Sequence, residues 1–321
     1  MSVEAFRELF RLDVGLVQGP MGGVAGPKLV AAVSNAGALG VLPIWARDPA
    51  GARRLMERTS ALARRPYAVN LRADLVQTAH VAEALAADIT LFHLFWGDPA
   101  ATAREILAGG GRFIATVGDA EAARIALDAG ACALVAQGVE AGGHVLSETP
   151  LEALLAEVLP LAAETPVLAA GGIVTPEDAA RALVLGASGV LCGSRFVASD
   201  ESEAHDDYKL ALVEAGADAT VRSLCYDLGW SEAPHRTLVT ETYRRWAAAG
   251  AAPMGDRPGE EDVMFTTAEG TAIPRYFVAP PAQGMQGQVL EGALYAGSGV
   301  ERISATRSAA DLVADFAAVL A

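Results

Sequence analysis

In the first 197 or so residues, short apolar runs alternate with alanine-rich stretches of helical character. The apolar runs are almost unbroken, which is typical of strands buried on both faces of a parallel sheet. There are eight of them, at residues 14–18, 38–42, 67–71, 89–93, 112–116, 132–136, 166–170 and 188–192. Eight strands with helices between them predict a (β/α)₈ TIM barrel, and a doubly wound sheet is the alternative fold.

The ends of the expected helices agree with this repeat. We expect helices near 27–36, 49–63, 79–86, 99–107, 120–128, 151–163 and 176–185. Several of them begin with a proline, whose missing N–H is tolerated in the first turn of a helix. The segments NAGALGVL, DAGACALV and LGASGVLC each end a helix with a glycine and then enter an apolar strand, which indicates short connections from helix to strand.

The repeat stops after residue 197. A helical stretch at about 200–215 is followed by a polar region rich in glycine and proline, and an amphipathic helix over 307–320 then closes the barrel. We therefore predict that residues 1–199 and 296–321 form the barrel. Residues 200–295 are predicted to be an inserted lid or small domain between the eighth strand and the last helix, on the ligand-binding rim.

Charge and cysteine content exclude several classes of protein. The chain has 24 Lys and Arg residues against 39 Asp and Glu residues, a net charge of −15, whereas nucleic-acid or anionic membrane binding needs a basic surface. Cys132, Cys192 and Cys225 are too few and too far apart for a disulfide framework. We find no secretory signal and no apolar stretch of membrane-spanning length, so we expect a soluble, cytoplasmic protein.

Glycine-rich segments follow several of the expected strands. They are QGPMGG at 18–23, QGVEAGGH at 137–144, AGGI at 170–173 and GSRF at 193–196. The carboxyl ends of barrel strands form the active site, and the last two loops commonly hold a phosphate through backbone N–H groups. Position alone therefore predicts a phosphorylated cofactor, although a single glycine pair is usually just a turn.

Among the five histidines, His144 is the strongest catalytic candidate because it follows a strand and two glycines. A surface-loop histidine is the alternative interpretation. His93 also ends a strand, where a hydrogen-bonded core histidine and a ligand contact are equally compatible with its apolar surroundings. We expect structural roles for His80, His205 and His235, which lie in helical or inserted segments.

Taken together, these segments resemble the nitronate monooxygenase family, formerly called 2-nitropropane dioxygenases, whose members are FMN-dependent (β/α)₈ enzymes. The resemblance extends over almost the whole chain. It is carried by VQGPMGGVAGPKLVAAVSNAGALGVL, ALVAQGVEAGGHV, VLAAGGIVTPEDAARALVLGASGVLCGSRFVASDESEAHDDYK, LGWSEAPHRTL and LEGALYAGSGVERI.

The resemblance implies a role for each matching residue. His144 matches the catalytic histidine of the family, and Ser298 stands where relatives often carry Gln. Three residues would lie beside the isoalloxazine ring, two would hydrogen-bond its polar edge, and seven would hold the ribityl chain and phosphate. In that order they are Pro20, Met21 and Gly22; Asn70 and Gln137; and Gly142, Gly143, Ala170, Gly171, Gly172, Gly193 and Ser194.

The implied reaction is FMN-dependent oxidation of alkyl nitronates, and of nitroalkanes, by O₂ to carbonyl compounds and nitrite. Neutral His144 would remove the acidic C–H proton of a nitroalkane. A flavin-dependent enoyl-acyl-carrier-protein reductase using NAD(P)H is the nearest alternative, and a non-catalytic flavin-binding protein is another. The expected partners are the small substrate and O₂, without nucleic acid or membrane, and a homo-oligomer is allowed.

Overall fold

The computed structural model describes residues 2–321 and contains a sheet of eight parallel strands. Each strand is three to six residues long and starts within three residues of its predicted position. They are β1 (Leu16–Gln18), β2 (Val41–Pro43), β3 (Ala68–Arg72), β4 (Leu91–Phe95), β5 (Arg112–Val117), β6 (Ala133–Gln137), β8 (Val167–Ala170) and β9 (Val190–Cys192).

The sheet closes on itself. Its hydrogen-bonded order is β1-β9-β8-β6-β5-β4-β3-β2, and a parallel bridge between Val17 and Leu39 joins the two ends. The backbone hydrogen bond from Gln18 N to Leu39 O, 2.9 Å long, belongs to this junction. The predicted (β/α)₈ barrel is therefore confirmed, and the doubly wound alternative is wrong.

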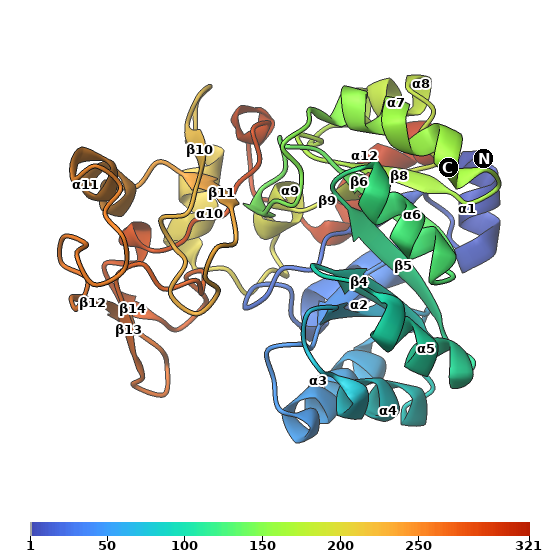
Figure 1. Ribbon diagram of the computed structural model, residues 1–321, viewed down its shortest axis with the longest axis horizontal. Coiled ribbons are helices and arrows are strands. Elements are labelled where there is room, and N and C mark those ends of the chain that lie inside the picture. The colour runs from blue at the N-terminus through green and yellow to red at the C-terminus, as the bar shows by residue number, and fades with distance from the viewer. Residues whose placement is uncertain (1) are drawn as a thin grey trace.

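Helices cover the outside of the barrel, as Figure 1 shows. Seven of them connect successive strands, and α12 (Ala309–Leu320) packs between α2 and α8 to complete the ring. The seven are α2 (Pro27–Asn35), α3 (Pro49–Leu62), α4 (Thr78–Ala86), α5 (Ala100–Ala108), α6 (Ala120–Asp128), α7 (Leu151–Ala162) and α8 (Pro176–Val184). Each of these helices begins and ends within two residues of its predicted position.

One helix at the amino-terminal end of the barrel was not predicted. Helix α1 (Val3–Phe10) begins at Ser2, whose hydroxyl accepts a hydrogen bond from the N–H of Ala5. Its buried Phe6 and Phe10 pack against the interior-facing residues of the strands. The helix therefore closes the amino-terminal end of the barrel, and this leaves the carboxyl ends of the strands as the open rim.

The chain between β9 and α12 forms a second lobe on that rim (Figure 1). It starts with α9 (Ser194–Val197) and α10 (Asp206–Val213). It also contains two small antiparallel sheets and the helix α11 (Glu241–Ala248), and neither these nor α9 were predicted. Its remaining elements are β10 (Thr220–Ser223), β11 (His235–Leu238), β12 (Val263–Thr266), β13 (Ala272–Pro274), β14 (Gln286–Gly287) and the 3₁₀ turns η1 (Val289–Glu291) and η2 (Val300–Arg302).

The lobe and the barrel are joined by a shared sheet. The two-residue strand β7 (Gly143–His144), which follows β6, pairs with β11, and β11 pairs with β10. The Arg236 guanidinium adds hydrogen bonds of 3.2 and 2.9 Å to the Val139 carbonyl. Within the described residues, the helices lack the combination of length and apolar character needed to cross a bilayer.

Candidate active site

A cavity of about 630 Å³ lies at the rim, between the barrel and the second lobe. Every residue to which the sequence analysis gave a catalytic or cofactor-binding role lines it. These residues are Pro20, Met21, Gly22, Asn70, Gln137, Gly142, Gly143, His144, Ala170, Gly171, Gly172, Gly193 and Ser194. The cavity therefore brings together residues of strands β3, β6 and β8 and of the loops after β1, β6, β8 and β9, as the barrel topology requires.

Glycines allow the backbone to approach one side of the cavity. Gly171 and Gly172 have φ angles of 122° and 67°, in the region that favours glycine. At Gly193 a Cβ atom would meet nothing within 4 Å. The N–H groups of Gly172 and Gly193 donate to no acceptor in residues 2–321. They are free to bind an anion.

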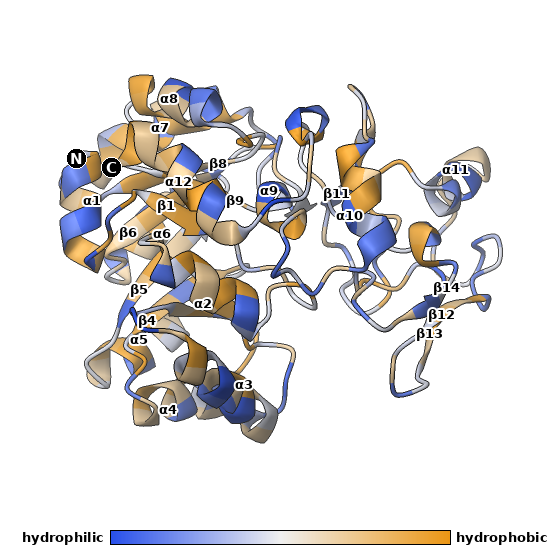
Figure 2. Ribbon diagram, turned by 180° about the vertical axis from the view of Figure 1, so that it is seen from behind, coloured by the Kyte–Doolittle hydropathy of each residue, from blue (hydrophilic) through white to orange (hydrophobic). Residues whose placement is uncertain are grey.

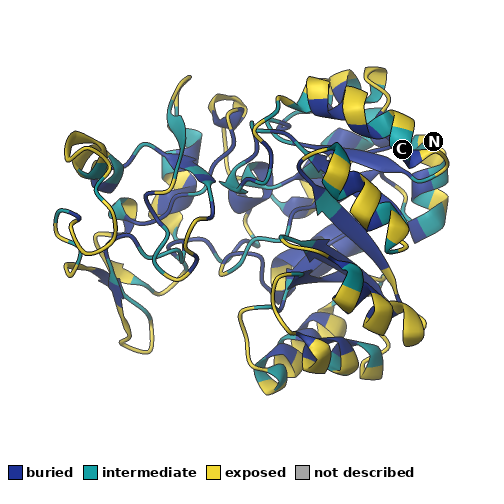
Figure 3. Cartoon of the chain, viewed as in Figure 1, coloured by how far each residue is buried: buried dark blue, intermediate teal, exposed yellow. Residues whose placement is uncertain are grey.

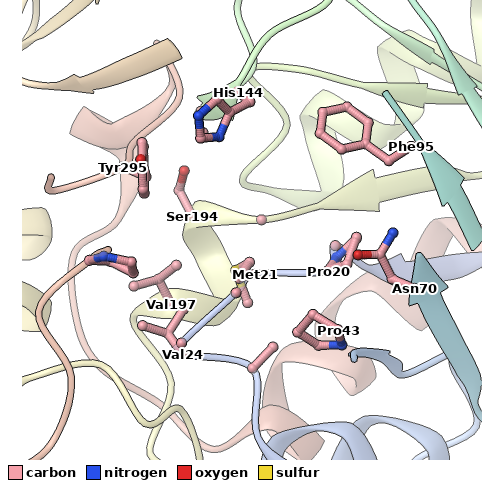
Figure 4. A pocket seen from close by; sticks show the side chains of 18 of the residues that line it. Pro20, Met21, Val24, Pro43, Asn70, Phe95, His144, Ser194, Val197 and Tyr295 are labelled. Atoms are coloured by element: carbon pink, nitrogen blue, oxygen red, sulfur yellow. The ribbon is translucent and has the colours of Figure 1, made fainter. Parts of the chain in front are cut away.

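The side-chain amide of Asn70 is hydrogen-bonded to a buried histidine. Its Nδ2 group lies 3.1 Å from His93 Nδ1, and His93 Nε2 lies 2.9 Å from Thr116 Oγ1. Because the Asn70 amide nitrogen is a donor, His93 Nδ1 accepts and His93 Nε2–H donates to Thr116. Burial lowers the pKa of His93 to about 4, which fits this neutral form. The Asn70 amide oxygen points toward Pro20 (Figure 4).

Gln137 supports the loop that carries His144. Its Nε2 group donates to the His144 carbonyl at 3.1 Å, and its Oε1 atom accepts from the Leu146 N–H at 2.9 Å. One N–H of this amide is left for a ligand. Gln137 therefore also stabilises the loop that carries His144, a role that was not predicted from the sequence.

His144 lies where the barrel and the second lobe meet. Its ring stacks on Trp230, with centroids 3.9 Å and planes 21° apart. Its Nε2 atom is buried and has no hydrogen-bond partner in the described chain. Burial, reinforced by His235 and Arg72, lowers the pKa of His144 well below its ordinary value. The imidazole is therefore neutral at pH 7, as a general base must be.

His235 is a structural neighbour of His144. The two residues are paired across β7 and β11, and their ring centroids lie 5.6 Å apart. His235 Nε2 accepts from the Tyr226 N–H at 3.0 Å, so its Nδ1–H donates to the Ala233 carbonyl at 3.0 Å. Burial lowers the pKa of His235 to about 4. Its two fixed hydrogen bonds agree with the structural role expected from the sequence.

An aromatic cluster at this end of the cavity was missed by the sequence analysis. Trp230 contacts Trp45, Phe95 and Trp96, with ring centroids 5.5, 6.3 and 5.2 Å apart. The Arg72 guanidinium lies 3.4 Å from the Trp230 ring centroid. Only the position of Trp96 beside Gly97, after a strand, gave a signal in the sequence, and packing explained it equally well.

Two serines lie on the glycine-rich side. Ser194 Oγ accepts a hydrogen bond of 2.9 Å from the Gly297 N–H, which holds the segment that returns from the second lobe. Ser298, where the sequence departs from the family, lies near Gly172, because a Cβ at Gly172 would be 3.4 Å from its Oγ atom. Ser298 therefore belongs to the same side of the cavity as the glycines.

The chain is similar to known sequences along most of its length. A family model described as nitronate monooxygenase matches residues 4–102 and 97–318. The nitronate monooxygenase of Pseudomonas aeruginosa is 31% identical over 303 residues, covering 79% of this chain and 85% of that one. The (3aS,4S,5R,7aS)-5-hydroxy-7a-methyl-1-oxo-octahydro-1H-indene-4-carboxyl-CoA dehydrogenase of Rhodococcus jostii is 34% identical over 238 residues. That match covers 74% of this chain and 66% of the relative's own length.

Solved structures agree with these matches. FabK from Thermotoga maritima superimposes with a TM-score of 0.78 at 25% identity, covering 97% of this chain and 94% of that one. Nitroalkane oxidase from Streptomyces ansochromogenes gives 0.76 at 27% identity, covering 98% and 97%. The chain therefore belongs to the nitronate monooxygenase family and is a flavin-dependent oxidoreductase of that type.

Proposed function

We propose that this enzyme is an FMN-dependent nitronate monooxygenase that oxidises alkyl nitronates, and nitroalkanes after deprotonation, with O₂. Two nitronates and one O₂ give two carbonyl compounds and two nitrite ions, so each nitronate gains one of the two oxygen atoms and no external reductant is consumed. The observation that carries the proposal is the neutral His144 at one end of a cavity whose other side is formed by glycines. Family membership supports the reaction type.

The glycine side fits the phosphate of FMN. A chain with a net charge of −15 has no general attraction for an anion, so binding must come from local donors. The free N–H groups of Gly172 and Gly193 supply such donors, and the absence of side chains there lets a phosphate approach them. The bound flavin would supply the redox chemistry, while the protein orients it and the substrate.

Other residues around the cavity support the flavin ring. The loop after β1 would pack against one face of the ring through Pro20, Met21 and Gly22. The Asn70 oxygen, which accepts no hydrogen bond in the described chain, would accept one from a ring N–H. The remaining N–H of Gln137 would donate to a ring oxygen.

His144 would act on the substrate as a general base. A neutral imidazole within about 3 Å of the acidic carbon can take its proton. A preformed nitronate has already lost this proton, so for that substrate His144 would orient the anion instead.

Oxygen consumption tests the proposal. FMN-loaded enzyme is mixed with a preformed alkyl nitronate in the absence of NAD(P)H, and O₂ uptake and nitrite are followed together. We expect nitrite to form at twice the molar rate of O₂ uptake, because each O₂ supplies one oxygen atom to each of two nitronates. Turnover that appears only with NAD(P)H would contradict the proposal.

A second candidate is NAD(P)H-dependent reduction of an enoyl thioester. The name of the Rhodococcus jostii relative, a dehydrogenase of a carboxyl-CoA compound, favours a thioester substrate. Rapid oxidation of NAD(P)H by crotonyl thioester, with no nitrite formed from nitronates, would identify this activity instead.

A further inference from the structure

A second cavity lies behind the aromatic cluster. It is more open to solvent than the first, has a volume of about 460 Å³, and its lining combines charged and aromatic side chains, among them Arg72, Asp74, Asp227, Trp96 and Trp230. The main cavity contains His144 but not Arg72, and the second contains Arg72 but not His144. Among the described aromatic residues, Trp230 is the one that lines both. Its indole therefore separates the two cavities.

Contacts on both faces hold this indole in place. The His144 ring stacks 3.9 Å from Trp230, and the Arg72 guanidinium lies 3.4 Å from the same ring system. Two groups this close to one ring must occupy opposite faces, which agrees with their separation into different cavities. Arg72 is fixed in turn by Asp74, whose Oδ1 atom accepts from Arg72 Nε at 3.0 Å. Trp230 is buried, with 8% of its surface exposed.

The position of His144 brings the substrate close to this partition. A base must lie within about 3 Å of the proton that it removes. Since His144 is stacked on Trp230, a carbon within reach of the imidazole lies beside the indole. The glycine side of the cavity is the proposed flavin phosphate site, so the alkyl chain of the substrate extends along the aromatic side.

We propose that Trp230 is a specificity-determining residue whose indole limits the chain length of the substrate, so that this enzyme acts on short-chain nitronates. Removal of the indole joins the two cavities and admits longer chains into the second. This inference rests on the proposed function, because it places the reacting carbon beside His144.

Calorimetric titration of the FMN-loaded enzyme with straight-chain carboxylates, from propionate to decanoate, tests the inference without turnover. A carboxylate resembles a nitronate in being a planar anion with two oxygens. Each methylene that becomes buried should tighten binding about fourfold. In the wild-type enzyme we expect this gain to stop after the first few methylenes. In Trp230→Ala it should continue for several more, and in Trp230→Leu for fewer than in Trp230→Ala.

The gain per methylene is the informative quantity, because the loss of Trp230 also uncovers the guanidinium of Arg72, which stays paired with Asp74. An uncovered guanidinium would strengthen binding of every carboxylate by the same factor and leave the gain per methylene unchanged. Trp246→Ala is the matched control, since Trp246 lies in α11 of the same lobe and lines neither cavity. It should keep the wild-type profile.

Several results would overturn the inference. In the wild-type enzyme, affinity that keeps rising with each methylene up to decanoate would overturn it. So would affinity that stops rising at the wild-type chain length in both Trp230 variants, or a Trp246→Ala profile that changes as much as the Trp230→Ala profile. Failure of all the carboxylates to bind would overturn it as well. The proposed function can fail separately. If nitronates are not oxidised but the carboxylate profiles differ as expected, the partition is supported and the nitronate reaction is wrong.

Discussion

The barrel and the second lobe contribute to the site in different ways. The barrel strands are buried along nearly their whole length, whereas the second lobe has short strands and much exposed loop (Figure 3). Hydrophobic residues concentrate in the barrel strands and on one side of its helices (Figure 2). The barrel supplies the glycines, the backbone donors and the aromatic side chains of Trp45 and Phe95 to the cavity, and the lobe adds Trp230 and Tyr295.

This difference follows from how each region is built. Parallel strands in register bring the ends of all eight strands to one rim, so glycines after successive strands must meet there. The lobe has no such repeat. Its side chains are held at the site by contacts with the barrel loops, among them the pairing of β11 with β7 and the hydrogen bonds from Arg236 to the Val139 carbonyl. The cavity therefore has a glycine side set by the barrel topology, and an aromatic side on which Trp45 and Phe95 of the barrel meet Trp230 of the docked lobe.

The largest effect is expected at His144, where the two regions meet. His144→Ala should slow oxidation of a neutral nitroalkane by roughly 10²–10⁴-fold, the usual contribution of a positioned base. Oxidation of the preformed nitronate should slow much less, because its proton is already gone. Steady-state rates are compared at equal FMN content. Equal losses on both substrates would show that His144 only binds or orients.

On the glycine side, Gly172→Glu should weaken FMN binding. Its carboxylate would stand close to the proposed phosphate, and two unit charges about 5 Å apart repel by roughly 3 kcal/mol at an effective dielectric constant of about 20. The FMN dissociation constant should therefore rise on the order of a hundredfold, measured by flavin fluorescence.

Gly110→Glu is the control for backbone strain. Gly110 has a φ of 78°, close to the 67° of Gly172, but a Cβ there meets nothing within 4 Å and the residue does not line the cavity. Both variants should lose stability, and only Gly172→Glu should lose flavin. Unchanged flavin affinity in folded Gly172→Glu would remove Gly172 from the phosphate site.

Acid should destabilise the two regions through different histidines. Burial lowers the pKa of His93 in the barrel and of His235 in the lobe to about 4. The unfolded chain binds protons at about pH 6.5, so between pH 6.5 and 4 it holds protons that the folded protein lacks. The free energy of unfolding therefore falls as pH falls through this window, by up to about 1.4 kcal/mol per pH unit for each histidine.

Urea unfolding at several pH values checks this. His93→Asn and His235→Asn should each reduce the slope of the unfolding free energy against pH by an amount that corresponds to at most one bound proton. Two results together would show that the lobe responds to acid separately. As the wild-type protein is acidified, α11 and the rest of the lobe unfold at a higher pH than the barrel, and in His235→Asn the lobe unfolds at a lower pH than in the wild-type protein. An unchanged slope in both variants would refute the assignment.

The smallest effect concerns mobility. We predict that amide hydrogens in residues 200–295 exchange faster than those in the barrel strands, because fewer of them lie in continuous sheets or long helices. Exchange should slow in this region when substrate binds, if it covers the cavity. Hydrogen exchange followed by mass spectrometry tests both statements. Uniform protection that ligand does not change would argue against a lid.

The sequence by itself determined the barrel and the positions of its glycines. The eight buried strands are visible in the sequence as apolar runs. Prolines mark the beginnings of several helices, and glycines mark the ends of helices just before the next strand. These are local signals. Because the topology of a barrel brings strand ends together, local signals were sufficient to place Gly172, Gly193 and His144 around one cavity.

Only the tertiary structure decided the aromatic side. Trp45, Phe95 and Trp230 come from three distant segments, and no periodic pattern links them. The strands of the lobe are two to four residues long, too short to give a recognisable alternation of polar and apolar residues. The stacking of Trp230 on His144 depends on the pairing of β7 with β11, a long-range contact that neither segment specifies alone.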